Sequence, residues 1–490
     1  MLKCQAESIQ KLVKESKNIC CSMYTKYFRY RSTVQKTSKH NNILYKMSST
    51  PQKIIIDCDA GVDDCQALML ALSHHVHSKI QIIAITCVSG NVHISKVIQN
   101  VKRCLVIKAI EQSKLHSTSL LHSSILQIPI YYGASEPLVI DVDEDVKDAK
   151  FWHGNDGIGG SASAVDLGIA IACGSTETAT KLLNSTPTET TPASVKIGQL
   201  ILTHPNEITI VALGPLTNIA LACKLYSSFS TLTKQLIFMG GTRYARGNAN
   251  LTSEFNAFGD PEALQICLRS FTNPQNHQNI VMVGWDLTCK TGVPFDYVQQ
   301  QWFHVNDNGS DGIEGDNPVS AFLALISAEI VHKSQQGPWS KCGLLIPDPL
   351  AMCAALCFNT VVKNTQQYFA TCELNGKRTR GQVVIDYDGL FSVGDVNEDE
   401  NRSDDNGKGG VEGSSVETMT GKIRNLTVVT EMDVNVVMKM LSESTRSNSK
   451  MSKMNVEYNR QFNAELKAVS VENSRLTDVE LDLKWGTMRA

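Results

Sequence analysis

Residues 54–64 read Ile54-Ile55-Ile56-Asp57-Cys58-Asp59-Ala60-Gly61-Val62-Asp63-Asp64, and this stretch decides how the chain folds. The apolar run at 54–56 predicts a buried strand, and the spacing of apolar residues over 67–72 predicts a helix. The segment between them is therefore a strand-to-helix turn at the carboxyl end of the strand. Ligands usually bind at that edge of an open α/β sheet.

Four carboxylates lie within eight residues of this turn. Asp57 and Asp59 share a face if the strand continues through them, because side chains alternate along a strand. Gly61 lets the turn close, and Asp63 and Asp64 fall in the first helical turn, where the helix dipole favours negative charge. Helix capping would account for one or two of these acids. Four anions so close repel one another, which predicts a hard divalent cation, Ca²⁺ or Mg²⁺, among oxygen ligands.

Composition narrows the class of protein. The net charge of −3 over 490 residues gives no reason to expect nucleic acid or membrane partners, and no apolar run reaches the roughly 18 residues of a membrane span. The fifteen cysteines are scattered without Cys-x-x-Cys pairs. This argues against a disulfide scaffold or a zinc site and indicates the reduced thiols of a cytoplasmic protein.

From residue 53 onward, apolar strands alternate with helical segments. This pattern predicts an α/β fold with a mostly parallel central sheet flanked by helices. The expected strands are 53–58, 80–87, 208–213, 235–239, 279–283 and 425–430. The expected helices are 65–74, 94–108, 216–225, 261–268, 317–333, 349–357 and 432–442. A small antiparallel extension is expected from 368–375 and 380–387, bent at Asn375-Gly376.

The ends and two internal segments differ from this pattern. The first fifty residues are basic, with only Glu7 and Glu15 as acids. We interpret them as a disordered extension before an internal start at Met47, with a mitochondrial presequence as the alternative. The rest is interpreted as one enlarged domain at 51–442, inserts at about 160–200 and 393–422, and a polar tail at 443–490. The second insert is too polar to bury enough surface to order itself.

The acidic stretch resembles the signature of the nucleoside hydrolases, Asp-x-Asp-Pro-Gly-x-Asp-Asp. Ala60 replaces the Pro, which affects the stiffness of the turn rather than the acids. Four further elements are similar to those of the family: Val88-Ser89-Gly90-Asn91, Leu213-Gly214-Pro215-Leu216-Thr217-Asn218, the segment from Gly247-Asn248 to Glu254-Phe255-Asn256, and Pro347-Asp348-Pro349. The resemblance implies a Rossmann-like nucleoside hydrolase fold. It also implies hydrolysis of the N-glycosidic bond of ribonucleosides to ribose and a free base.

The resemblance further implies a role for each residue. Ca²⁺ would be held by Asp59, Asp64, the carbonyl of Leu213 and Asp348, and Asp59 would accept a proton from the metal-bound water. Asp57 would order the shell of metal ligands without binding the ion directly. The ribose would be anchored by Asp63, Asn91, Asn248, Glu254 and Asn256. Relatives are commonly dimers or tetramers, so a homo-oligomer is expected.

The residues that would assist the departure of the base differ from the family pattern. Many relatives have His immediately before the late Asp, as a proton donor to the base, whereas this chain has Pro347, which cannot donate. His153 matches another family His near the base. Trp152 beside it and Trp339 are candidates to stack on a purine, and they predict a purine preference. A lone His or Trp in a loop is as often a packing residue as a residue of the active site.

Two other interpretations remain open from the sequence. A haloacid-dehalogenase-like phosphatase also begins with Asp-x-Asp after a strand and uses Mg²⁺, but it lacks the Asp63-Asp64 pair. A divergent relative could bind a nucleoside without cleaving it. Retention of every proposed metal carboxylate argues against that second alternative, because clustered anions are costly without a cation.

Overall fold

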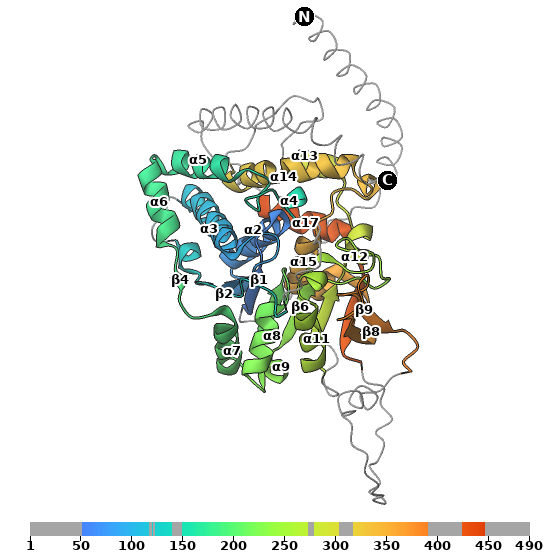
Figure 1. Ribbon diagram of the computed structural model, residues 1–490. Coiled ribbons are helices and arrows are strands. Elements are labelled where there is room, and N and C mark those ends of the chain that lie inside the picture. Colours follow the sequence, from blue (N-terminus) through green and yellow to red (C-terminus); the bar gives the residue numbers. More distant parts are fainter. Residues whose placement is uncertain are drawn as a thin grey trace, which may run out of the picture. The chain divides into compact units, whose positions relative to one another are not determined.

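The computed structural model describes residues 51–116, 120, 123–139, 149–272, 279–302, 317–390 and 424–445. The predicted extension at 1–50, the insert at 393–422 and all but the first three residues of the tail at 443–490 lie outside the described residues. Residues 51–490 form a unit separate from 1–50. Everything below concerns the described part of the larger unit (Figure 1).

A ten-stranded sheet runs through the described residues in the order β4-β3-β2-β1-β5-β6-β7-β10-β8-β9. Every pair from β4 to β10 is parallel, whereas β8 is antiparallel to both β10 and β9. The strands are β1 (Gln52–Cys58), β2 (Ile80–Cys87), β3 (Ile130–Tyr131), β4 (Thr188–Glu189), β5 (Ile208–Ala212), β6 (Gln235–Met239), β7 (Ile280–Val283), β8 (Val362–Cys372), β9 (Val383–Asp386) and β10 (Leu426–Met432). The predicted fold class, a mostly parallel sheet with a small antiparallel extension, is confirmed.

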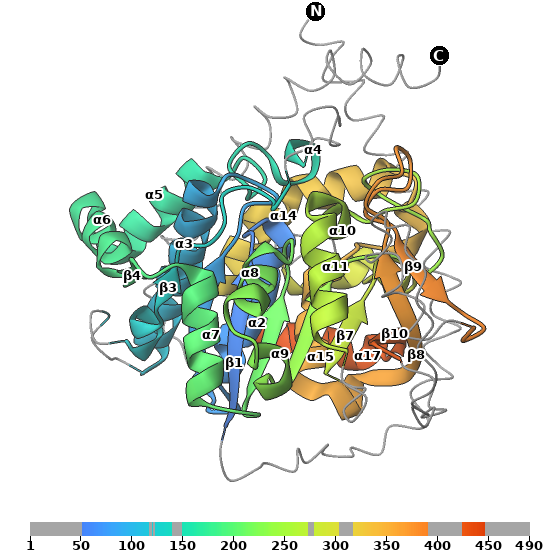
Figure 2. The same ribbon diagram turned by 60° about the horizontal axis from the view of Figure 1, so that its bottom comes forward.

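Helices cover both faces of the sheet. Consecutive side chains of a strand point to opposite sides, and in this sheet apolar side chains lie on both. Ile54 and Ile56 pack into the core on one face and Ile55 into the core on the other. The first core includes α2 (Val62–Val76), α3 (Ile94–His116), α5 (Ala162–Cys173), α6 (Thr176–Ser185), α12 (Trp285–Lys290), α13 (Phe295–Gln301), α14 (Pro318–Gln336), α15 (Pro347–Val361) and α17 (Val434–Thr445). The second includes α7 (Ala193–Thr203), α8 (Thr217–Leu225), α9 (Phe229–Leu232), α10 (Phe255–Gly259) and α11 (Pro261–Ser270), seen in front of the sheet in Figure 2. The short elements are η2 (Ser124–Gln127), α4 (Lys150–His153) and η3 (Ser340–Cys342).

The strand order places the acidic turn where a ligand site is expected. β1 pairs with β2 on one side and with β5 on the other, so the chain reverses its direction of travel across the sheet at β1. Loops that follow the two neighbouring strands diverge at such a switch point and leave a crevice at their carboxyl ends. The acidic turn, residues 88–91 and residues 213–218 all lie at this edge.

The predicted elements and the observed ones agree along most of the domain. β2 and β6 have the expected bounds, and the other predicted strands of the parallel part differ by one or two residues at an end. Residues 160–200, interpreted as an insert with a weak helical pattern, contain α5, α6, β4 and most of α7. β8 begins six residues before the predicted start at 368. Among the described residues, no helix is both long enough and apolar enough to cross a membrane.

Candidate active site

The first two acids of the turn are held by neighbouring strands and loops. Asp57 is fully buried at the end of β1. Its Oδ1 accepts hydrogen bonds from Thr86 Oγ1, on the adjacent strand, and from Asn218 Nδ2 at 2.8 Å. Asp59 is also fully buried, and its Oδ2 accepts from the backbone N–H of Asn91 at 2.7 Å. Two strands and the start of α8 therefore fix both carboxylates.

The turn itself is unusually tight around Ala60 and Gly61. Ala60 has a φ of 40°, a left-handed conformation that Pro, with φ near −65°, cannot adopt. Gly61 has an ordinary φ of −72°, so its lack of a side chain serves close packing. A Cβ there would lie 2.4 Å from Nδ2 of Asn91 and 2.8 Å from Nδ1 of His153. The glycine thus makes room for two predicted site residues.

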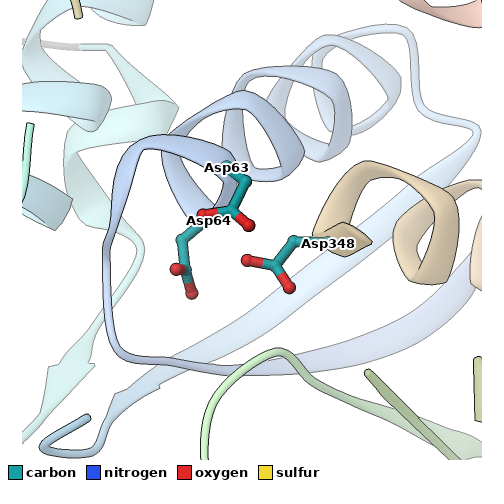
Figure 3. A group of neighbouring side chains, drawn as sticks. All are labelled: Asp63, Asp64 and Asp348. Atoms are coloured by element: carbon teal, nitrogen blue, oxygen red, sulfur yellow. The ribbon is translucent and has the colours of Figure 1, made fainter. Parts of the chain in front are cut away.

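Asp63, Asp64 and Asp348 bring their carboxylates together, with ligand oxygens within 4.8 Å of one another (Figure 3). The first two come from the amino end of α2 and the third from the amino end of α15. Asp64 is tied to the turn, because Gly61 N–H and Asn91 Nδ2 donate to its Oδ2 at 2.9 and 3.2 Å. Acidic side chains almost 300 residues apart in the sequence therefore form one group.

The electrostatics of this group, and of Asp59 on the same turn, favour a bound cation. Burial, followed by the negative charge of neighbouring carboxylates, holds the pKa of Asp59 and of Asp348 well above the usual range. Burial raises the pKa of Asp63 to about 6. The Oδ1 atoms of Asp59 and Asp63 are buried and have no hydrogen-bond partner among the described residues. Unpartnered carboxylate oxygens are the ligands that a hard divalent ion prefers, so the residues present fit a metal.

His153 lies against the acidic turn as a neutral side chain. Its Nδ1 accepts a hydrogen bond from Val62 N–H at 3.2 Å and lies 3.7 Å from Oδ1 of Asp63. Burial lowers the pKa of His153, Asp64 opposes this shift and Lys333 adds to it, and the resulting pKa is about 4. In a neutral imidazole whose Nδ1 accepts, the proton is on Nε2. His153 can therefore donate a hydrogen bond from Nε2.

The polar segment 247–256 curls on itself beside β6. Gly247 N–H donates to Leu251 O at 3.1 Å, and Asn248 Oδ1 accepts from Phe255 N–H at 2.9 Å. Glu254 is buried and caps α10, accepting from Asn256 N–H, Ala257 N–H and Gly241 N–H. Both oxygens of Glu254 thus bind backbone, and burial raises its pKa to about 7.

Asn256 links this segment to the neighbouring strand ends. Its Nδ2 donates to Leu213 O at 2.6 Å and to Met239 O at 3.1 Å. The carbonyl of Leu213, a metal ligand by resemblance, therefore has a protein partner in this structure. Gly214 follows it and lies against Asp59, because a Cβ there would be 3.0 Å from Cγ of Asp59. The loop after β5 and the acidic turn are in direct contact.

Three tryptophans from distant segments form one aromatic cluster. Trp152 and Trp339 have ring centroids 6.1 Å apart, and Trp285 meets Trp339 edge-on at 5.5 Å. All three side chains are half-buried. Trp285 was not among the predicted site residues. Its position directly after β7, at the carboxyl edge of the sheet, is the signal that could have identified it.

The comparisons with known proteins decide the family. The sequence profile described as inosine-uridine preferring nucleoside hydrolase matches residues 54–439. The chain belongs to this family. The inosine-uridine preferring nucleoside hydrolase of Leishmania major is 31% identical over 339 residues, which are 69% of this chain and 88% of that protein. Uridine nucleosidase 1 of Arabidopsis thaliana is 28% identical over 299 residues, 57% of this chain and 75% of that protein.

The fold comparison agrees with the sequence comparison. The solved structure of an inosine-guanosine nucleoside hydrolase superimposes with a TM-score of 0.60 at 22% identity, covering 82% of this chain and all of that one. Family membership makes this protein a ribonucleoside N-glycosyl hydrolase. The family binds a metal ion, which suits the aspartate cluster. The phosphatase interpretation of the acidic turn is thereby excluded.

Proposed function

We propose that this nucleoside hydrolase depends on Ca²⁺ and prefers purine ribonucleosides. The observation that carries the metal proposal is the group of buried carboxylates of Asp63, Asp64 and Asp348, together with the unpartnered Oδ1 atoms of Asp63 and of Asp59 on the same turn. Asp59, Asp64 and Asp348 would hold the ion together with the Leu213 carbonyl, if the hydrogen bond from Asn256 gives way. A bound hard cation would supply a water that loses its proton more readily than bulk water does.

Around that ion, the chain's own residues bind the sugar and move the proton. Asp59 uses Oδ2 to accept from Asn91 N–H, and its unpartnered Oδ1 is then the atom that takes the proton from the attacking water. Asp63 and Asn91 would bind ribose hydroxyls from the side of the acidic turn. Asn248, Glu254 and Asn256 would do so from the segment after β6. Fixing the sugar in this way holds the anomeric carbon against the water.

The transition state of such a reaction resembles an oxocarbenium ion, as in other glycoside hydrolysis. The buried carboxylates lie close enough together to stabilise the positive charge that develops on the sugar ring. Asp57 uses Oδ1 for its hydrogen bonds, and its Oδ2 is buried without a hydrogen-bond partner among the described residues. Its hydrogen bonds to Thr86 and Asn218 support a role in ordering the strand ends rather than in the chemistry.

The base would leave through the aromatic cluster. Pro347 begins α15 and cannot donate a proton to the leaving base, so other groups would assist its departure. His153, protonated on Nε2, would donate a hydrogen bond to the base. Trp152, Trp339 and Trp285 supply a wall with enough aromatic area for a purine. The names of the relatives include uridine as well as inosine and guanosine, so the purine preference rests on these tryptophans.

One assay tests both parts of the proposal. The full chain is incubated with inosine, adenosine, guanosine and uridine, with Ca²⁺, with Mg²⁺ and with chelator, and released ribose is measured. We expect ribose release with Ca²⁺, little with chelator, and a higher kcat/KM for the purines. Asp59→Ala should abolish release. Equal activity in chelator would contradict the metal proposal, and a preference for uridine would contradict the purine proposal.

We also propose that the enzyme is a cytoplasmic homo-oligomer. The described cysteines all remain thiols, including Cys58 and Cys87, which face each other on adjacent strands. Thiols so placed persist in a reducing compartment. Imaging of a fluorescent fusion of the full chain tests the location, and light scattering after gel filtration tests for a dimer or tetramer. Import into mitochondria or a monomeric mass would overturn these proposals.

A further inference from the structure

An ion pair between a buried arginine and a half-buried glutamate joins the β8–β9 connection to α11. Arg380, in the connection 373–382, is only 7% exposed. Its Nη1 and Nη2 donate to the two carboxylate oxygens of Glu262 at 2.8 and 2.9 Å, and Nη1 also donates to Leu374 O. Glu262 lies in the first turn of α11. A bidentate pair of this kind fixes the direction of the arginine as well as its distance.

The backbone of the same connection holds the segment 247–253, the part of the proposed ribose-binding region that precedes α10. Arg380 O accepts from Asn250 Nδ2 at 3.0 Å and from Ser253 Oγ. Arg378 O accepts from Thr252 Oγ1 at 3.2 Å. These bonds tie three side chains of the segment to two backbone carbonyls of the connection, those of Arg378 and Arg380.

Both segments are closely packed against their surroundings. Gly381 has a φ of 80°, and a Cβ there would lie 2.7 Å from Cα of Phe258 in α10. A Cβ at Gly247 would lie 2.3 Å from Asn250 O. The segment is polar and buries few apolar side chains, so hydrogen bonds rather than a hydrophobic core determine its position. A shift of Arg380 would therefore move Asn248 and Glu254 with it.

We propose that Arg380, oriented by Glu262, is a positioning residue that holds the 247–254 segment in place to bind the sugar. The inference rests on the proposed function, since the segment's role in binding ribose belongs to that proposal. Arg380 acts through its side chain on Glu262 and through its carbonyl on Asn250 and Ser253. It does not touch the sugar itself.

Hydrogen–deuterium exchange of the full chain tests the positioning directly. In Glu262→Gln and Arg380→Lys, we expect amide exchange in residues 247–256 to rise about tenfold, because a local opening becomes easier. Exchange in α2, across the sheet, should stay as in the wild type. Asn250→Ala cuts the link from the other side with the ion pair intact and should raise exchange in the same segment. Glu207→Gln, which breaks the surface pair with Lys53 at the opposite end of β1, is the matched control.

Kinetics then separate positioning from a loss of folded protein. With a ribonucleoside, the Glu262→Gln and Asn250→Ala variants should raise KM more than they lower kcat. The same comparison is made with nucleosides that lack one sugar hydroxyl. The difference in KM between wild type and variant should become smaller when the missing hydroxyl is the one that the segment binds. A loss equal for every sugar, or unchanged exchange in 247–256, would overturn the inference. Absence of ribose release by the wild type would refute the proposed function instead, and the exchange result would still decide the positioning.

Discussion

Gly61 and Asn91 pack so closely that a Cβ on Gly61 would lie 2.4 Å from the Nδ2 atom of Asn91. That nitrogen donates to Asp64, so the glycine and one carboxylate of the cluster hold the amide between them. The backbone angles of Gly61 are open to any residue. The requirement for glycine therefore comes from the neighbouring side chains.

Gly61→Ala should therefore impair the site more than the fold. Asn91 and His153 must both move, and overpacking of this kind costs about 1–3 kcal/mol in the free energy of unfolding. Displacement of site residues by about 1 Å can lower activity about 100-fold, which we expect for ribose release.

The control for Gly61→Ala is Gly174→Ala, at the end of α5. Gly174 has a φ of 77° and open space where a Cβ would be, so alanine there costs about 1–2 kcal/mol in backbone strain alone. Chemical denaturation and ribose release are measured for both variants. Equal activity losses in the two would contradict the steric explanation.

The turn shows what the sequence alone could predict. The apolar run of β1 and the acids after it are contiguous, so the strand, the turn and a cation requirement followed from one short stretch. β3 and β4 have two residues each, too few for any periodic pattern. The start of β8 is mostly polar, and none of its first six residues is buried, so these residues lacked the apolar alternation that identifies a strand.

The site was predictable where its residues follow strand ends and unpredictable where distant segments meet. Asp348 was found only through resemblance, since one Asp before a helix is common. Trp285 joins Trp339 through packing that no local pattern encodes. The left-handed conformation of Ala60 was also missed, because alanine carries no signal for a positive φ.

Asp64→Asn should weaken metal binding without unfolding the protein. Asp64 contributes to the carboxylate group, and an amide is a weaker ligand for a hard cation than a carboxylate. At Ca²⁺ about 100 times above its Kd, the wild type should gain about 2.7 kcal/mol in unfolding free energy. The variant should lose most of that gain at the same concentration, in thermal unfolding with and without Ca²⁺. Glu177→Gln, which removes an exposed carboxylate of α6, should keep the full gain; an equal gain in Asp64→Asn would refute its role as a ligand.

Metal-free protein should become less stable as the pH rises from about 4 to about 7. The folded-state pKa of Asp57 and of Glu254 is raised to about 7, and that of Asp63 to about 6. In this window the folded state keeps protons that the unfolded state has released, so the unfolding free energy falls with pH. His153, with its pKa lowered to about 4, acts in the opposite direction below its ordinary value of 6.5.

The measurement for this pH dependence is thermal unfolding in chelator and in Ca²⁺. Among the described residues, seven carboxylates have a raised pKa and four imidazoles a lowered one, so the midpoint in chelator should drop with pH. Ca²⁺ competes with protons for the same oxygens, so its stabilising effect should grow with pH. A midpoint in chelator that rises steadily from pH 4 to pH 7 would show that the carboxylates are not raised.

Trp285→Ala should lower kcat/KM for inosine more than for uridine. Trp285 packs edge-on against Trp339 at 5.5 Å, and Trp339 in turn lies beside Trp152, so removal of one ring loosens the wall proposed for a purine. Aromatic contacts are worth about 0.5–1.5 kcal/mol beyond the area they bury, which corresponds to a loss of up to about tenfold for the purine. The smaller ring of uridine should lose less. Trp302→Phe, which alters a tryptophan buried in the core, is the control and should change both substrates equally. Equal losses for inosine and uridine in Trp285→Ala would remove the aromatic cluster from base recognition.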